Sequence, residues 1–536
     1  MKNRIRCTFA LITALAVSTI LSCTKLDESV YDSIIAESTE LTSEDINNIV
    51  APAYTSLRAL YWGWHSYFDT QEESSDVIVT PIRLPRGGWD DGGVYRTMHM
   101  HTWDATQSHT RQLWSRCFAG INNINRAIYQ LQQIEGLENL EVALDELRAL
   151  RAFYYYILLD HFRNVPIVDR FDVPKGFLPE QNPAEEVFAF VESELAEVLP
   201  RLSEEQSAAT YGRMNKWAAK MVLAKLYLNA EVYIGIPKWE AAMIQVDDII
   251  NSTKFNLAAN YKDPFITDNE ESVEQLFSIP FDEIYAKEFN YHMKTLHALS
   301  QQTFGIQAEP WGGSCAIPQF IDTYDPDDSR LSDTWLAGPQ YSSSGEPLIL
   351  GDQQLDYTNR LSELTGSQEN EGLRFVKYEI KQGSLAGLSN DVPFFRYTDA
   401  LMIKAECLLR LGDATGAASI VTSIRQRAFA NTDPSKATVT ADQLKMGSRY
   451  AYGNYANGAM TTVEGGADIP FGRFLDELGW EFAGEHHRRQ DLIRFGVFTT
   501  KSWFAHQPNG QHRVYFPIPQ VQLDVNGNLQ QNEGYN

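Results

Sequence analysis

The sequence predicts a mainly α-helical protein: an α-solenoid-like scaffold of tetratricopeptide-type helix pairs that carries a loop-rich subdomain with short strands. Apolar residues recur at steps of three and four over residues 121–158 and 187–228, which is the spacing of one helix face. Residues 398–429 have the spacing of a helix pair. Residues 255–390 are rich in Gly, Ser, Asn, Asp and Pro, which favours loops and short strands.

In the first half of the chain, apolar stripes predict a series of helices. They contain residues 121–134, 144–158, 187–198 and 217–228, and a further helix begins near Trp239. Asn182-Pro183 opens the third, where Pro is tolerated because the first turn needs no amide donor. Trp114 and Trp217 stand at helical spacing and are expected in the core.

Small residues mark the helix pair near the other end of the chain. The pattern, which resembles a tetratricopeptide repeat, consists of Ala405, Leu408, Leu411, Gly412, Ala417 and Ala418. Small side chains let two antiparallel helices approach closely, and Gly412 is expected in the turn between them. Several such pairs in one chain favour an α-solenoid over an unrelated bundle.

The first residues have the pattern of a bacterial lipoprotein signal. Lys2, Arg4 and Arg6 are followed by an apolar run over residues 9–21, which is too short for a comfortable membrane span. A small residue then precedes Cys23, as at a lipoprotein cleavage site. We therefore expect residues 1–22 to be a signal peptide, Cys23 to be lipidated and residues 23–45 to be a tether.

The rest of the chain divides by composition into three parts. We predict a helical N-terminal part over residues 46–254, a loop-rich subdomain on the ligand side over 255–390 and a helical C-terminal part over 391–536. No further segment is long and apolar enough to span a bilayer.

Charge and cysteine content exclude two classes of function. The chain of 536 residues has a formal net charge of −25, which would repel the phosphates of nucleic acid. Apart from Cys7 and Cys23, only Cys117, Cys315 and Cys407 remain, and none lies in a Cys-x-x-Cys spacing. We expect neither a disulfide framework nor a zinc ribbon, and no cofactor.

The stretch PRGGWDDGGVYRTMHMHTW, residues 85–103, allows three interpretations. Its Gly pairs precede no Lys-Ser/Thr, so a phosphate loop is disfavoured. His99 and His101 would share one face of an extended segment, but a metal site lacks an obvious third ligand. A Gly-flexed loop that leads into a strand-like run ending at Trp103 would instead form one wall of a ligand platform.

Two acidic clusters have structural explanations. Glu481, Glu485 and Arg488 follow one another at i, i+4 and i+7, so we expect ion pairs that tie down the end of the chain rather than a metalloprotease helix, which needs His at i and i+4. Asp325, Asp327 and Asp328 lack the twelve-residue loop of a calcium site and are expected in a turn followed by Arg330. We predict neither a metal site nor catalytic residues.

Five segments together resemble the SusD/RagB family of outer-membrane nutrient-binding lipoproteins. They are residues 148–166 (RALRAFYY…FRNVP), 212–227 (GR…Y), 396–406 (RYTDA…E), 481–494 (EFAGEHHR…DLIR) and 516–535 (FPIP…NL.QN.GY). Their order is that of the family, over nearly the whole mature chain. The sequence departs from the family pattern at Trp217, Trp480 and Gly484-Glu485, which puts local packing in doubt.

This resemblance implies a function. The chain would be a surface-exposed glycan-binding lipoprotein of the outer membrane, anchored through acylated Cys23, that captures an oligo- or polysaccharide and delivers it to a SusC-like TonB-dependent transporter. It implies no catalysis. A peptide-capturing lid of a RagA-like transporter is the alternative, and a surface glycoside hydrolase is a further one, because its carboxylate pair is set by the fold and not by sequence spacing.

The resemblance also indicates where the ligand would bind. Family members that bind starch-like glycans carry an arc of aromatic side chains with an Arg on the loop-rich face. Aromatic rings cover the apolar face of a sugar, and loops on a rigid scaffold are where such rings are exposed. Trp62 and Trp64 also lie in loop-like sequence or at the boundary of a predicted element. The glycan-binding residues predicted here are Arg86, Trp89, Trp103, Tyr285, Tyr291 and Trp311.

Overall fold

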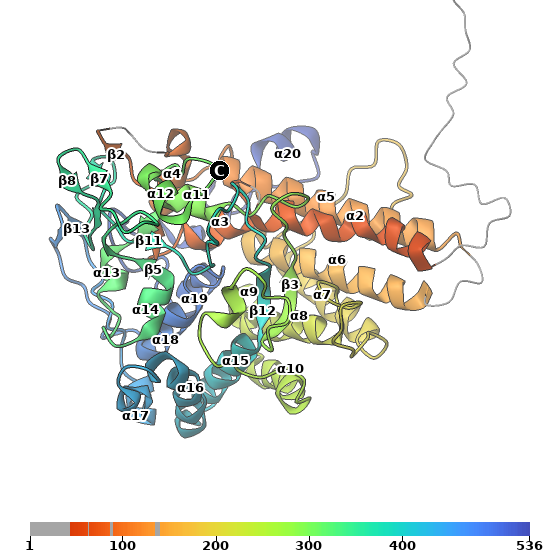
Figure 1. Cartoon of the computed structure of the whole chain (residues 1–536). Coiled ribbons are helices and arrows are strands. Elements are labelled where there is room, and N and C mark those ends of the chain that lie inside the picture. Colours follow the sequence, from red (N-terminus) through yellow and green to blue (C-terminus); the bar gives the residue numbers. More distant parts are fainter. Residues whose placement is uncertain (1–42, 63, 86–88, 135–139, 536) are drawn as a thin grey trace, which may run out of the picture. The chain divides into compact units, whose positions relative to one another are not determined.

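The computed structural model describes residues 43–62, 64–85, 89–134 and 140–535, which form one compact unit (Figure 1). The predicted signal peptide, Cys23 and Arg86 lie outside the described residues. Within them, no helix is both long and apolar enough to cross a membrane.

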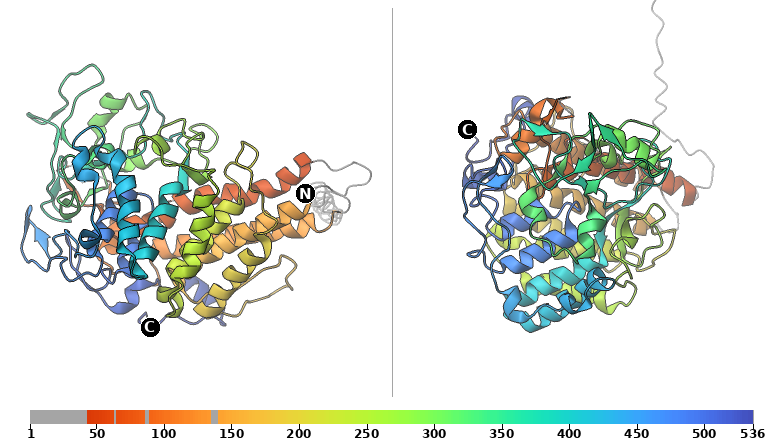
Figure 2. Two further views of the ribbon diagram at one scale, coloured as in Figure 1. Left: turned by 90° about the horizontal axis from the view of Figure 1, so that it is seen from below. Right: turned by 60° about the vertical axis from the view of Figure 1, so that its left-hand side comes forward.

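A continuous series of packed helices forms the scaffold. In chain order these are α2 (Ser43–Trp62), α5 (Ser108–Leu131), α6 (Leu140–Phe162), α7 (Ala184–Val198), α8 (Lys216–Leu228), α10 (Trp239–Asn251), α15 (Tyr397–Arg410) and α16 (Ala414–Phe429). From α5 onward each packs against the next, apart from a thinner contact between α7 and α8, and α2 packs on α5 (Figure 2). The predicted scaffold of helix pairs is thus confirmed.

Local sequence explains why these helices begin and turn where they do. Asn215 caps α8 by accepting hydrogen bonds from the amides of Trp217 and Ala218, which satisfies two otherwise unpaired donors. Gly412 has φ +97° in the turn between α15 and α16, a conformation that other residues rarely adopt. Trp114 and Trp217 are 3% and 5% exposed, as expected for core residues.

Shorter helices connect the scaffold to the loop-rich part. They are α3 (Tyr67–Glu72), α4 (Val94–His99), α9 (Ala230–Ile234), α11 (Tyr291–Thr295), α12 (Gln301–Phe304), α13 (Pro318–Ile321), α14 (Ser329–Thr334), α17 (Ala441–Leu444), α18 (Gly472–Phe482), α19 (Arg488–Arg494) and α20 (Gln520–Val525).

The strands are short and pair only in twos. The longest pair is β3 (Gln275–Ile279) with β12 (Val392–Arg396), antiparallel and fully buried, with Val392 opposite Ile279. The other strands are β1 (Ile78–Val79), β2 (Arg83–Leu84), β4 (Cys315–Ala316), β5 (Trp335–Leu336), β6 (Gly338–Pro339), β7 (Ile349–Leu350), β8 (Gln353–Gln354), β9 (Asp356–Tyr357), β10 (Ser367–Gln368), β11 (Arg374–Phe375), β13 (Tyr455–Ala456) and β14 (Ala459–Met460).

The strand-like run predicted to end at Trp103 is wrong. Residues 94–99 form helix α4, which begins after Gly92 and Gly93, both with positive φ. The alternation of Met and His resembles a strand, but the glycines turn the chain so that His99 and His101 become fully buried on separate partners. The ring of His99 bonds the carbonyl of Phe504, and that of His101 bonds the carbonyl of Ser74.

A buried network of charges joins the loop-rich part to the C-terminal helices. Arg396, at the end of β12, contacts Glu274, Glu481 and Glu485 at 2.7–3.0 Å. Arg330, in α14, contacts Glu481 at 3.2 Å. The arginines outweigh the effect of burial and hold the pKa of Glu481 well below its usual range.

The structural interpretation of Glu481, Glu485 and Arg488 is confirmed, but not the predicted single stripe. Helix α18 ends at Phe482 and α19 begins at Arg488, because the chain turns at Gly484, which has φ +72°. Each side chain therefore pairs with a distant segment, and Arg488 contacts Asp76 at 2.7 Å.

Replacing Arg396 with Met should lower the free energy of unfolding by about 3–5 kcal/mol, because three carboxylates then lose a buried partner. Urea unfolding would measure the loss. Lys404→Met, in the following helix α15, is the control, since its pair with Asp247 is partly exposed and exposed pairs contribute about 0–1 kcal/mol. Equal losses in the two variants would contradict the assignment.

Buried neutral histidines should make the fold acid-sensitive. Burial lowers the pKa of His99 to about 4, although its bond to Phe504 opposes the shift. Its stability contribution is therefore complete above pH ~6.5, the unfolded value, and is lost as the pH falls toward 4. In His99→Gln, the loss of unfolding free energy between pH 7 and pH 5 should be smaller by roughly 2 kcal/mol.

Urea titrations at the two pH values would test this expectation. His512→Gln is the control, because His512 is partly exposed and its removal should change the pH dependence much less. An unchanged pH dependence in His99→Gln would refute the role of His99.

Candidate functional site

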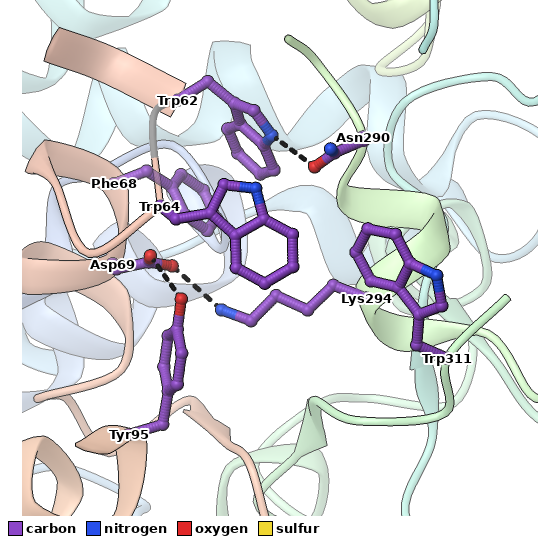
Figure 3. Close-up of a pocket in the computed structure, with 8 residues that line it drawn as sticks. All are labelled: Trp62, Trp64, Phe68, Asp69, Tyr95, Asn290, Lys294 and Trp311. Atoms are coloured by element: carbon purple, nitrogen blue, oxygen red, sulfur yellow. Dashed lines mark hydrogen bonds and ion pairs between the residues drawn. The ribbon is translucent and has the colours of Figure 1, made fainter. Parts of the chain in front are cut away.

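A pocket lined by aromatic residues lies between the end of α2, helices α3, α4 and α11, and the loop after α12 (Figure 3). It has about 280 Å³ of empty space, counted out to the surface. Its lining residues are Trp62, Trp64, Phe68, Asp69, Tyr95, Asn290, Lys294 and Trp311. A shallow site of this kind presents faces rather than a deep cavity.

Three indoles form the outer part of this site, which we call the tryptophan cluster: Trp64, Trp89 and Trp311. The ring centroid of Trp64 lies 4.9 Å from that of Trp89 and 5.2 Å from that of Trp311. Trp64 is 38% exposed, and the other two are half-buried. Apolar faces this large are rarely left in water without a binding role when they lie together.

Backbone contacts hold two of the indoles in place. The amide of Trp89 donates to the carbonyl of Trp311 at 3.2 Å, and the amide of Trp311 donates to the carbonyl of Met293 at 2.7 Å. Gly313 makes this approach possible, because a Cβ there would lie 2.8 Å from the Trp89 ring and 3.0 Å from the carbonyl of Lys294. The loop that carries Trp89 is thus fixed to the loop that carries Trp311.

A buried charge cluster lies beneath the indoles. The ammonium of Lys294 is 2.8 Å from Asp69 and 2.8 Å from Glu73, and the hydroxyl of Tyr95 donates to Asp69 at 2.7 Å. Burial raises the pKa of Asp69, but Lys294 outweighs it, so the net shift is downward. For Lys294, burial lowers the pKa, and the two carboxylates reverse the shift and raise it. Asp69 and Lys294 therefore stay charged near neutral pH.

Lys294 also fixes the rings around it. Its ammonium lies 4.0 Å from the centroid of the Tyr95 ring and 5.5 Å from that of Trp89, within the range of cation–π attraction. On the opposite side, the indole N–H of Trp62 donates to the side-chain oxygen of Asn290 at 3.0 Å. The amide nitrogen of Asn290 makes no hydrogen bond among the residues that the structure describes, and it is half-buried at the pocket.

Of the six predicted glycan-binding residues, the structure brings Trp89 and Trp311 together. Tyr285 is separate from the pocket lining: it is 89% exposed, on a turn where Asp282 accepts from its amide. Tyr291 is 2% exposed and packs beneath the site against Trp62 at 5.3 Å. Arg86 lies outside the described residues.

Trp103 is not available as a contact residue. Its side chain is 1% exposed, its indole N–H donates to the hydroxyl of Tyr535 at 2.7 Å, and its ring packs on Phe516. These partners come from the end of the chain. Trp103 therefore anchors the C-terminus and does not line a platform.

The pocket residues that the sequence-based prediction did not include are of two kinds. Trp62 and Trp64 lie on either side of a glycine in the sequence, and this pattern could have identified them as candidates. The polar residues Asp69, Asn290 and Lys294 carried no signal, because they come from unrelated stretches. Among the described residues, no group of three or more His, Cys, Asp or Glu side chains is placed to hold a metal. Asp325 and Asp327 instead pair with Lys436.

Comparisons with known proteins indicate the family to which this chain is similar. A model of the SusD family matches residues 318–535, and a model described as starch-binding, associating with outer membrane, matches residues 38–228. The starch-binding protein SusD of Bacteroides thetaiotaomicron is 26% identical, with 83% of this chain and 82% of that protein covered. SusD-like protein P25 of Formosa agariphila is 22% identical over 96% of this chain and 97% of its own length.

Solved structures show the same fold. A laminarin-binding SusD-like protein superposes with a TM-score of 0.69 at 20% identity, covering 92% of this chain and all of the other. Surface glycan-binding protein A from Bacteroides thetaiotaomicron, in complex with laminarihexaose, gives 0.65 at 19% identity over 92% of this chain and 100% of that one. Because the two family models together match residues 38–228 and 318–535, the chain belongs to the SusD/RagB family.

Gly313→Ala should separate Trp89 from Trp311, because the added methyl group collides with a ring and two carbonyl oxygens. We expect a loss of about 1–3 kcal/mol in unfolding free energy, as for an overpacked site, and a change in the near-UV circular dichroism of the coupled indoles. Gly527→Ala is the control, since nothing lies within 4 Å of a Cβ there. A wild-type near-UV spectrum in Gly313→Ala would show that the added methyl group is accommodated without separating the indoles, and would contradict the prediction.

Proposed function

We propose that this protein captures glycans on the tryptophan cluster and passes them to a SusC-like TonB-dependent transporter. The observation that supports it most directly is the exposed Trp64, held against Trp89 and Trp311 on a bed of buried charges. Sugars have apolar C–H faces, and flat indoles match them. The buried charge cluster keeps the rings fixed before the ligand binds, so the side chains lose little conformational freedom on binding.

Polar groups around the indoles suit a neutral ligand. The Asn290 amide at the pocket can bond a hydroxyl, whereas Lys294 is already bound by two carboxylates. The buried charge cluster contains two carboxylates and one ammonium, so its formal charge is negative. An acidic sugar or a phosphate would meet repulsion here, so we infer a neutral oligo- or polysaccharide.

Relatives support glycans over the alternatives. Proteins of this family are described as starch-binding, laminarin-binding and surface glycan-binding. A glycosidase needs a carboxylic acid with a raised pKa, whereas Lys294 lowers that of Asp69. No feature of the pocket favours a peptide, but a peptide pool bound in mass spectrometry in place of any glycan would reverse this choice.

Location and partners follow from the same proposal. One matching family model is described as associating with the outer membrane, and Cys23 in its lipoprotein-like context would supply the lipid anchor. In this arrangement the chain faces outward and hands its ligand to the barrel transporter. Co-purification with a barrel from outer membranes, lost after Cys23→Ser, would be the corresponding experiment.

Trp64→Ala should reduce affinity for the bound glycan about tenfold or more, near ~1.4 kcal/mol, because an exposed aromatic anchor is removed. Isothermal titration calorimetry against a panel that includes laminarihexaose and maltohexaose would measure it. Tyr341→Ala is the control, since Tyr341 is 45% exposed elsewhere. Unchanged affinity in Trp64→Ala, beside a wild type that binds, would place the ligand on another surface.

A further inference from the structure

We infer a second glycan-binding surface in a groove on the helical scaffold, between the C-terminal part of α5, helix α6 and residues 167–177. The groove has about 1450 Å³ of empty space, counted out to the surface, against about 280 Å³ for the pocket at the tryptophan cluster. The inference extends the proposed function, because it assigns a further contact to the same class of ligand.

The segment that forms one wall of the groove is held rigidly from below. Asn125 donates to the carbonyl of Val168 at 2.9 Å, and Arg151 donates to the carbonyl of Asp169 at 2.5 Å. The hydroxyl of Tyr155 accepts from the amide of Val168 at 2.7 Å. Arg151 is itself 5% exposed and paired with Glu194 at 2.7 Å. A segment anchored by so many buried groups has a defined outer face.

That outer face carries exposed aromatic rings. Tyr129, Phe171 and Phe177 are 39%, 38% and 40% exposed. The ring centroids of Tyr129 and Phe171 lie 5.8 Å apart at an interplanar angle of 43°. A single exposed ring needs no explanation, but three around one groove, two on this segment and Tyr129 on α5, mark a binding surface.

Polar side chains stand beside these rings. Gln132, Arg170 and Asp172 are exposed at the groove, and their side chains make no hydrogen bond within the described part of the chain. An amide, a guanidinium and a carboxylate together offer donors and acceptors for hydroxyl groups. Three arginines and three carboxylates line the groove in all, so it is neutral overall and suits an uncharged glycan.

Helix α5 relates the groove to the tryptophan cluster. His109, near its start, contacts Tyr95 of the pocket with ring centroids 4.8 Å apart. Tyr129 lies twenty residues later on the same helix, which corresponds to about 30 Å along the axis at 1.5 Å per residue. Only a polysaccharide that extends beyond this distance and follows the surface around α5 contacts both surfaces, whereas a short oligosaccharide contacts only one. Two weak contacts on one polymer raise its apparent affinity by about 10²–10⁴-fold.

The test compares short and long ligands on the mature chain. Calorimetry would use laminarihexaose and maltohexaose, and affinity electrophoresis would use laminarin and starch. In Tyr129→Ala/Phe171→Ala we expect at least a tenfold loss of affinity for the polymer that binds, with less than a twofold change for its hexasaccharide. Tyr341→Ala should behave as wild type in both assays.

A second arm removes the tryptophan cluster. Trp64→Ala/Trp311→Ala should keep weak binding of the polymer, and this remainder should vanish when Phe171→Ala is added. Gln132→Ala/Arg170→Ala probes the groove without touching an aromatic residue and replaces the aromatic variant should that variant misfold, as judged by circular dichroism.

Three results would overturn the inference. Polymer affinity that is unchanged in both groove variants removes the second surface and leaves the proposed function intact. Equal losses for hexasaccharide and polymer would mean that the groove is not a separate site. A wild-type chain that binds none of the four glycans removes the proposed function and the second surface together.

Discussion

The structure depends on charges that are buried in pairs where segments distant in sequence meet. Arg396 joins Glu274 of the loop-rich part to Glu481 in the C-terminal helices, and Lys294 joins α11 to Asp69 in α3. Burying such charges gives little net stability compared with an apolar core, but an unpaired partner is strongly penalised. The pairs therefore select one arrangement of the loops over others with equally apolar interiors.

This constraint explains how the tryptophan cluster is maintained. Indoles that face water would gain from collapsing onto the core, and loops rich in glycine would allow it. The buried charge cluster beneath them prevents that movement, because Trp89 and Trp311 are tied by backbone hydrogen bonds and the ring of Trp89 also contacts Lys294. The exposed indoles are thus placed on loops, and their geometry is set by the scaffold.

The helical scaffold was predictable from the sequence because its signals are local. A period of 3.6 residues predicts which face of a helix is buried, and Trp114 and Trp217 followed it. The site was predictable only in part. Trp89 and Trp311 stand beside glycines that indicate exposed turns, whereas the burial of Trp103 depends on Tyr535, 432 residues later. Likewise Lys294 and Asp69 are 225 residues apart, so no spacing in the sequence announces their pairing.

The buried charge cluster beneath the pocket and the exposed residues on its rim differ in how freely their sequence can change. The buried side chains of Asp69 and Lys294 belong to the fold, and few replacements would preserve their charge and reach. Trp64, on the rim, is 38% exposed to solvent. Selection can therefore vary the rim residue by residue while the bed stays constant. A glycan-binding protein with this division can acquire new ligands without passing through an unstable intermediate.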